Sequence, residues 1–207
     1  MNKIIINKLE NLDDKTSEAY KTLRSNIQFC GDSIKTIAVT STLEGEGKSE
    51  VSLQLAKSMA EAGMRVVYLD VDMRKTPLWT TEAIDNKLMG LSHYLTGQSQ
   101  IVDVLYTTNI HRLYVIFSGP TAPNPVELLD NKKFIALVKS MREICDYIII
   151  DCPPLGNVID AVVVAKICDG TLIVVENNRV KIGGALKIKK QLDNCGTKIL
   201  GCIYNKA

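Results

Sequence analysis

Six short runs of apolar residues, separated by segments with helical spacing, are the feature that most constrains the fold. Each run is apolar along its whole length, which is typical of strands that are covered on both faces. The predicted strands cover residues 35–40, 65–70, 112–117, 146–151, 170–176 and 197–204. The predicted helices lie near residues 17–29, 48–63, 89–96, 125–144, 158–168 and 180–194. This alternation predicts an α/β fold in one domain, with a mostly parallel central sheet and helices on both faces.

Composition excludes several other classes of protein. Of the 207 residues, 46% are hydrophobic and 23% are charged, so the chain can bury a core without disulfide or metal staples. No apolar stretch reaches the ~18–20 residues of a membrane span, and the first residues are too charged for a signal peptide. The six cysteines lack the spacing of zinc or iron–sulfur sites, so free thiols in a reducing cytoplasm are expected. A net charge of +2 gives no reason to expect a nucleic-acid partner.

A glycine-containing loop, STLEGEGKSE, joins the first predicted strand to the helix over 48–63. Gly45 and Gly47 let the backbone curl so that its N–H groups point inward at a phosphate. Lys48 can reach the β- and γ-phosphates of a nucleotide, and the Ser49 hydroxyl can ligate Mg²⁺. The strict motif G-x-x-x-x-G-K-[ST] has a glycine at the position of Thr42. The simpler alternative is a glycine turn with a solvated lysine.

Three aspartates follow predicted strands. Asp70 and Asp72 come at the end of the second strand, and Asp151 ends the fourth. Ligands of parallel sheets bind beyond the carboxyl ends of the strands, so these carboxylates are expected to lie near Lys48 and Ser49. Carboxylates at apolar strand ends need a partner, and Mg²⁺ with a nucleotide supplies one. The alternative is that each aspartate only caps the next turn or helix.

Four sequence motifs resemble those of the bacterial tyrosine kinases (BY-kinases) of capsular and exopolysaccharide biosynthesis. TSTLEGEGKS (40–49) is similar to the Walker A loop of that family, and VVYLDVDMR (66–74) resembles its second acidic motif, Walker A′. YIIIDCPP (147–154) resembles its Walker B strand. SGPTAPNPVELL (118–129) resembles its proline-rich segment. The chain is therefore identified as similar to this P-loop family over nearly its whole length.

The resemblance implies roles for individual residues. Lys48 would hold the phosphates, and Ser49, Asp72 and Asp151 would serve Mg²⁺. Asp70 and Asp72 would supply the base that accepts the tyrosine proton, and the choice between them stays open. The nucleotide-binding residues implied by the loop are Gly45, Glu46, Gly47, Lys48, Ser49 and Glu50.

The resemblance also implies partners. It implies ATP-dependent, autophosphorylating transfer to protein tyrosines that regulates polysaccharide synthesis and export. Glu18, Lys21 and Arg24 resemble the ring-forming E-x-x-R-x-x-R helix, with Lys21 in place of the first arginine. A homo-oligomeric ring is expected, with a membrane adaptor whose cytoplasmic tail activates the kinase and recruits it to the inner face of the membrane. Residues 1–207 are expected to form one domain, with an N-terminal arm and oligomerisation helix (1–34) before the nucleotide-binding core (35–207).

Several positions depart from the family pattern. Glu50 stands where the family has threonine, and its carboxylate is expected to weaken nucleotide binding by repelling the α-phosphate; the alternative is that it faces outward. Glu44 replaces a loop proline, with little expected effect. The seven tyrosines are scattered rather than clustered at the C-terminus, and Tyr204 is expected to be a half-buried strand residue. Trp79 is expected to pack in the core.

Two other functions remain open at this point. The first is a ParA- or MinD-like ATPase switch without tyrosine phosphotransfer, although Leu43 stands where those proteins have their signature lysine. The second is a nucleotide-binding scaffold that has lost catalysis, as Glu50 and the missing tyrosine cluster would suggest.

Overall fold

The computed structural model describes residues 2–6, 12–75, 88–156, 158–179 and 182–206. Within these ranges the chain forms one eight-stranded sheet in the order β1-β4-β5-β3-β6-β2-β7-β8. Only the β4–β5 pair is antiparallel, and all other neighbours are parallel. The strands are β1 (Asn2–Lys3), β2 (Thr36–Ser41), β3 (Val66–Asp70), β4 (Tyr106–Thr107), β5 (Leu113–Ile116), β6 (Tyr147–Asp151), β7 (Gly170–Glu176) and β8 (Ile199–Asn205). The six predicted strands are therefore confirmed, and β1 and β4 are additions at the sheet edge.

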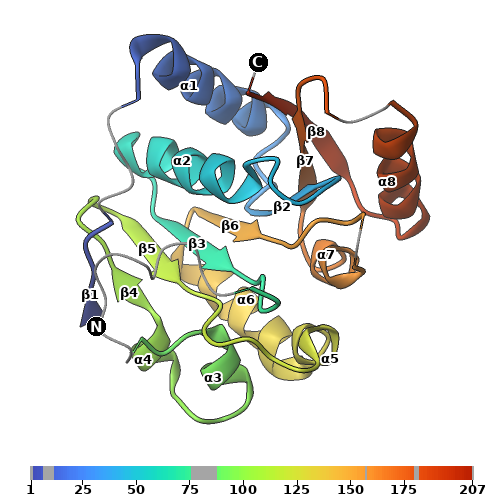
Figure 1. Cartoon of the computed structure of the whole chain (residues 1–207). Helices are drawn as coiled ribbons and strands as arrows, with labels where there is room; N and C mark the ends of the chain where they lie inside the picture. Colours follow the sequence, from blue (N-terminus) through green and yellow to red (C-terminus); the bar gives the residue numbers. More distant parts are fainter. Residues whose placement is uncertain (1, 7–11, 76–87, 157, 180–181, 207) are drawn as a thin grey trace.

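Helices connect most of these strands (Figure 1). They are α1 (Asp14–Phe29), α2 (Lys48–Glu61), α3 (Leu91–Leu95), α4 (Ile101–Val104), α5 (Pro125–Leu129), α6 (Lys132–Ile144), α7 (Asp160–Ala165) and α8 (Ile182–Asn194). None of the helices in the described ranges has the length and apolar character needed to cross a membrane. The predicted helix near 180–194 begins at Ile182, and residues 180–181, like Trp79, lie outside the described residues.

The single helix predicted near 125–144 is wrong, because the structure has two helices there. The Asn131 side chain accepts a hydrogen bond from the backbone N–H of Phe134 at 2.9 Å and so begins a new helix. Asn131 itself has an extended backbone, with φ −79° and ψ 157°. An asparagine at this position competes for the backbone and favours a helix start over a helix interior.

Two apolar layers cover the two faces of the sheet. On one face, Ile27 of α1 and Leu55 of α2 belong to the same buried cluster as Tyr68 of β3. On the other face, Phe134 of α6 and Leu192 of α8 belong to a second cluster, which also includes residues of α3, α5 and α7. Figure 1 shows α1 and α2 on one side of the sheet and α6 on the other. The α/β fold with helices on both faces is therefore confirmed.

The outermost strand, β8, differs from the sequence expectation at one residue. Tyr204 pairs with Val175 of β7, yet its side chain is 69% exposed rather than half-buried. The residues of α8 that are buried, Ile188 and Leu192, share a cluster with Val175 and Ile199. Tyr204 is thus a surface residue of this edge strand.

Candidate active site

The loop between β2 and α2 needs glycine at two positions. Gly45 and Gly47 have φ values of +82° and +81°, in the left-handed region that favours glycine. A Cβ atom on Gly47 would lie 2.2 Å from the side-chain amide nitrogen of Asn205. The loop therefore places backbone N–H groups at the start of α2, where the helix dipole favours an anion.

Glu46 supports this loop from the inside. Its buried carboxylate accepts hydrogen bonds from Thr42 Oγ1 at 2.7 Å and from the backbone N–H of Glu176 at 3.0 Å. Its carbonyl oxygen accepts a bond from the side chain of Asn205 at 2.9 Å. The backbone N–H of Leu43 donates to the same carboxylate oxygen as Thr42, at 2.5 Å. The side chain of Glu46 is thus engaged within the protein, and nucleotide binding by Glu46 through its backbone stays a prediction.

Lys48 lies among carboxylates at the carboxyl edge of the sheet. Its Nζ atom is 3.1 Å from Asp151 Oδ1, 3.8 Å from Asp72 Oδ2 and 3.2 Å from Ser49 Oγ. The residue is only 8% exposed. Burial alone would lower the pKa of Lys48, but Asp151, Asp72 and Asp70 outweigh burial and raise it. Lys48 is therefore a buried ammonium held by several negative charges.

Two further side chains hold Asp151, and the sequence prediction missed both. The Tyr68 hydroxyl donates to Asp151 Oδ2 at 3.1 Å, and Ser52 Oγ lies 3.4 Å from Oδ1. Tyr68 is two residues before Asp70 on β3, so both side chains face α2. Ser52 is four residues after Lys48 on the same helical face. These two spacings are the signals that could have identified them.

Asp70 and Asp72 are both buried and close to other negative charge. Burial, together with Asp151, raises the pKa of Asp70 to about 7. Burial also raises the pKa of Asp72, although Lys48 opposes this. Asp70 accepts a hydrogen bond from the backbone N–H of Asp72 at 2.9 Å. The site thus has more carboxylate charge than Lys48 alone can balance.

The same residues fit a magnesium–nucleotide complex. Ser49, Asp72 and Asp151 supply the oxygen donors that Mg²⁺ prefers. No group of three metal-binding side chains is preassembled in the described part of the chain, and Lys48 Nζ contacts both Asp72 and Asp151. Mg²⁺ is commonly held by one or two carboxylates together with substrate phosphates, so a preassembled protein cage is not needed.

The loop after β3 is fixed by two contacts that the sequence did not suggest. Arg74 makes a bidentate ion pair with Asp160, with distances of 3.1 Å from Nε and 3.0 Å from Nη2. The side chain of Asp160 is 1% exposed at the start of α7. The backbone N–H of Ala122, in the proline-rich segment, donates to Met73 O at 3.0 Å. The proline-rich segment and α7 therefore hold the acidic loop from two directions.

Glu50 lies in the first turn of α2, as predicted, and is exposed. Its carboxylate accepts a hydrogen bond from Gln54 Nε2 at 2.9 Å. Burial raises the pKa of Tyr20 on α1 to about 12, and the charge of Glu50 adds to this. The carboxylate is thus near α1, which supports the outward-facing alternative.

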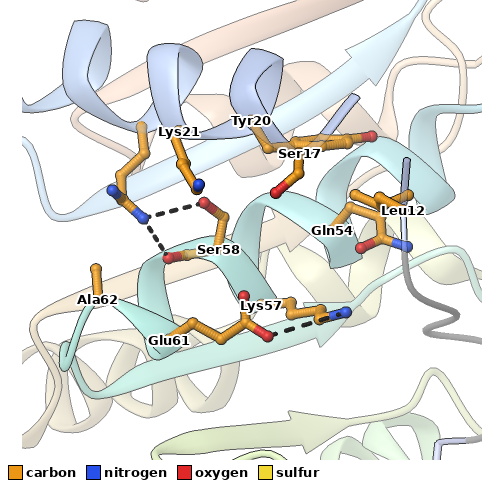
Figure 2. A pocket seen from close by; sticks show the side chains of 10 residues that line it. Leu12, Ser17, Tyr20, Lys21, Gln54, Lys57, Ser58, Glu61 and Ala62 are labelled. Atoms are coloured by element: carbon orange, nitrogen blue, oxygen red, sulfur yellow. Dashed lines mark hydrogen bonds and ion pairs between the residues drawn. The ribbon is translucent and has the colours of Figure 1, made fainter. Parts of the chain in front are cut away.

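The residues of the predicted oligomerisation helix lie on α1, beside a hollow of ≈ 500 Å³ between α1 and α2 (Figure 2). Lys21 Nζ and Glu18 Oε1 form an exposed ion pair at 2.6 Å. Arg24 turns toward its own chain and donates to the carbonyl oxygen of Ser58 at 2.7 Å. The structure therefore brings Glu18 and Lys21 together and uses Arg24 to dock α1 on α2.

Comparison with known proteins identifies the family. The family described as an AAA domain matches residues 34–200. The tyrosine-protein kinase CpsD of Streptococcus agalactiae serotype III is 42% identical over 192 residues, which is 93% of this chain and 83% of that protein. The crystal structure of the chimerical protein CapA2B2 is 32% identical with a TM-score of 0.89, covering 100% of this chain and 93% of that chain.

The MinD-like ATPases share the fold at a greater distance. The septum site-determining protein MinD of Pyrococcus horikoshii, complexed with Mg-ADP, is 25% identical with a TM-score of 0.69. That comparison covers 83% of this chain and 70% of the MinD chain. The match to the kinases is thus higher in identity and more complete, and this chain belongs to the bacterial tyrosine-protein kinases of capsule and exopolysaccharide biosynthesis, within the AAA-domain P-loop proteins.

Proposed function

We propose that this chain binds ATP with Mg²⁺ at the carboxyl edge of the sheet and transfers the γ-phosphoryl group to protein tyrosines, including those of its own copies. The observation that carries the proposal is Lys48, buried 3.1 Å from Asp151 directly behind a loop that needs glycine at Gly45 and Gly47. Such a constellation supplies positioning and charge, which are most of what phosphoryl transfer requires.

Separate groups of residues would bind the phosphates, bind Mg²⁺ and support the loop. Backbone N–H groups of residues 45–49 and the Lys48 ammonium would hold the phosphates. Ser49, Asp72 and Asp151 would hold Mg²⁺, which when bound neutralises charge on the phosphate oxygens. Glu46 would keep the loop in shape through its bonds to Thr42 and the Glu176 backbone.

One carboxylate would accept the proton of the attacking tyrosine. The phenol oxygen forms a bond to the γ-phosphorus, the bond to the β–γ bridging oxygen breaks, and ADP leaves. Asp70 and Asp72 both lie at this edge as candidates for the base. Asp70→Asn and Asp72→Asn, compared in kcat at saturating ATP, would distinguish them, because loss of the base lowers kcat without a matching change in nucleotide affinity.

The proposal extends to assembly. Self-association into a ring would use α1, with Glu18 and Lys21 exposed to a neighbouring copy. A membrane adaptor with a cytoplasmic tail would activate the kinase at the inner face of the membrane. Exposed charged side chains such as Glu18 and Lys21 are typical of reversible contacts between subunits.

A phosphotyrosine assay tests the catalytic proposal. The full chain with ATP and Mg²⁺ should phosphorylate a tyrosine-containing peptide, and Lys48→Met should abolish this. Lys187→Met is the matched control, since Lys187 is exposed on α8. ATP hydrolysis without phosphotyrosine would instead indicate an ATPase switch, and nucleotide binding without either reaction would indicate a scaffold.

A further inference from the structure

The carboxyl ends of β7 and β8 contact the loop between β2 and α2, which is the phosphate loop of the proposed site. Glu176 and Asn205 end these two strands and pair with each other in parallel register. The backbone N–H of Glu176 donates to the Glu46 carboxylate at 3.0 Å, and the side-chain amide of Asn205 donates to the Glu46 carbonyl oxygen at 2.9 Å. The last two strands therefore fix both the side chain and the main chain of Glu46, which is 1% exposed.

Lys206 holds the preceding residue of the phosphate loop. Its ammonium group donates to the carbonyl oxygen of Gly45 at 3.0 Å and lies 3.2 Å from the Glu176 carboxylate. Arg179 contacts the same carboxylate at 2.7 Å, and Arg179 together with Lys206 holds the pKa of Glu176 below its usual range. Glu176 therefore stays negatively charged and keeps the Lys206 ammonium group beside the loop.

Each of these two hydrogen bonds to a carbonyl oxygen fixes the direction of a peptide group. The peptide bond is planar and trans, so a carbonyl oxygen and the N–H of the following residue point in opposite directions. Asn205 holds the Glu46 carbonyl toward β8, and the N–H of Gly47 therefore points away from β8. Lys206 fixes the N–H of Glu46 in the same way, through the Gly45 carbonyl. Among the residues that the structure describes, neither N–H has a hydrogen-bond acceptor in the protein.

We infer that Asn205 and Lys206 are positioning residues of the nucleotide site, an inference that rests on the nucleotide binding in the proposed function. Asn205 aims the N–H of Gly47 at the phosphates through the Glu46 carbonyl oxygen. Lys206 aims the N–H of Glu46 through the Gly45 carbonyl oxygen. A phosphate oxygen is negatively charged, so its bond to a correctly aimed N–H is stronger than a bond between neutral groups. Neither side chain has to touch the nucleotide, because each acts through a carbonyl oxygen of the loop.

Calorimetry with Mg²⁺–ADP on the full chain measures what each contact contributes to binding. Asn205→Leu keeps the branched shape of the side chain without its donor, and we expect roughly tenfold weaker binding. Lys206→Met should weaken binding roughly threefold, because this side chain is 51% exposed, and Lys206→Arg, which keeps a charged donor, should restore it. Asn194→Leu, at the exposed end of α8, is the matched control and should bind as the wild type does. If Asn205→Leu does not fold, Asn205→Ala replaces it.

Nuclear magnetic resonance of the backbone amides separates positioning from a general loss of structure. In the wild type, saturating Mg²⁺–ADP should move the amide proton signals of Glu46 and Gly47 downfield, because both N–H groups bond to phosphate oxygens. Asn205→Leu should remove most of this shift at Gly47 and leave the shift at Glu46. Lys206→Met should do the opposite, reducing the shift at Glu46 and leaving the shift at Gly47.

Each other result contradicts the inference. Unchanged affinity for Asn205→Leu would show that its bond to Glu46 positions nothing that the nucleotide needs. Weaker binding with both amide shifts intact would show that Asn205 contacts the nucleotide itself, and equal loss of both shifts would show a loosened loop. In these cases the proposed function stands, because the wild type still binds Mg²⁺–ADP and phosphorylates the tyrosine peptide. A wild-type chain that does not bind Mg²⁺–ADP would overturn the proposed function together with this inference.

Discussion

Charged side chains gather in two regions of this molecule, the edge that holds Lys48 and the outer face of α1. Lys21 and Glu18 on α1 approach to 2.6 Å, whereas Lys48 and Asp151 are 3.1 Å apart. The α1 pair has side chains that are 51% and 69% exposed, and the Lys48 pair is almost fully buried. The shorter contact is thus the one that water screens.

In this protein the energetic effect of an ion pair therefore depends on its burial more than on the distance between its charged atoms. Exposed pairs contribute ~0–1 kcal/mol because solvent screens them and the side chains lose entropy. Breaking a buried pair leaves a charge without solvent or partner, which costs ~3–5 kcal/mol. The buried charges around Lys48 therefore carry a large desolvation free energy, which is expected for a site that binds a charged ligand.

The largest effect on folding is expected at Arg74. Arg74→Ala would leave Asp160, 1% exposed, without the guanidinium that balances it. Arg74 itself is 37% exposed, so water can replace part of its interaction, and we expect the free energy of unfolding to fall by ~2–3 kcal/mol in urea titration, against less than ~1 kcal/mol for Lys21→Ala. Equal effects of the two substitutions would contradict the comparison of buried and exposed pairs.

A smaller effect depends on pH. Burial and the nearby Asp151 raise the pKa of Asp70 to about 7 in the folded protein, well above the ~3.9 of an exposed aspartate, so the folded state binds the proton more tightly than the unfolded state. Its contribution stabilises the fold below pH 4 and is lost as pH rises through 7. Without nucleotide, the wild type should lose ~1–3 kcal/mol between pH 5 and pH 8 relative to Asp70→Asn, because one unit of pKa shift corresponds to ~1.4 kcal/mol of stability. Parallel stability curves for the two proteins would contradict this.

Glu50 is an exposed charge in the first turn of α2, next to the buried site. At ~6 Å from an α-phosphate, an unscreened carboxylate would cost ~1–2 kcal/mol of binding. Its bond to Gln54 keeps it outward, so Glu50→Thr should change the affinity for Mg²⁺–ADP by less than roughly threefold in calorimetry. Tightening by tenfold or more would show that the carboxylate turns toward the phosphates, and Glu50→Gln would then separate charge from shape.

The smallest effect on folding is expected on α1. Removing both Glu18 and Lys21 by alanine substitution should change the free energy of unfolding by ~0.5 kcal/mol or less, because both side chains are exposed. The same variant should shift the assembly toward monomer in analytical ultracentrifugation. Arg24→Ala is a separate variant, since it also removes the bond to Ser58. A parent chain that is monomeric at high concentration with nucleotide would contradict the ring.

Much of the fold could be predicted from the sequence, because parallel strands that are buried on both faces consist of continuous runs of apolar residues. β1 and β4 could not be, because two residues carry no periodicity. The break between α5 and α6 depends on the side chain of Asn131, which caps α6. The apolar residues on both sides of it keep helical spacing, so the sequence predicted one continuous helix.

The site divides in the same way. Lys48, Asp70, Asp72 and Asp151 follow from strand ends and a loop motif, and the structure brings them together. The hydrogen bond from the Glu176 backbone to the Glu46 carboxylate joins residues that are 130 positions apart. The Arg74–Asp160 ion pair joins residues that are 86 positions apart. Such contacts depend on the order of strands in the sheet, which no local pattern encodes.

Calorimetry of Mg²⁺–ADP binding tests most directly whether the buried charges around Lys48 form the nucleotide site. The wild-type chain should bind, Lys48→Met should show no measurable binding, and Lys187→Met should bind as the wild type does. Circular dichroism of all three proteins would confirm that each is folded under the conditions of the titration. Unchanged affinity in a folded Lys48→Met protein would show that this edge of the sheet is not the phosphate site.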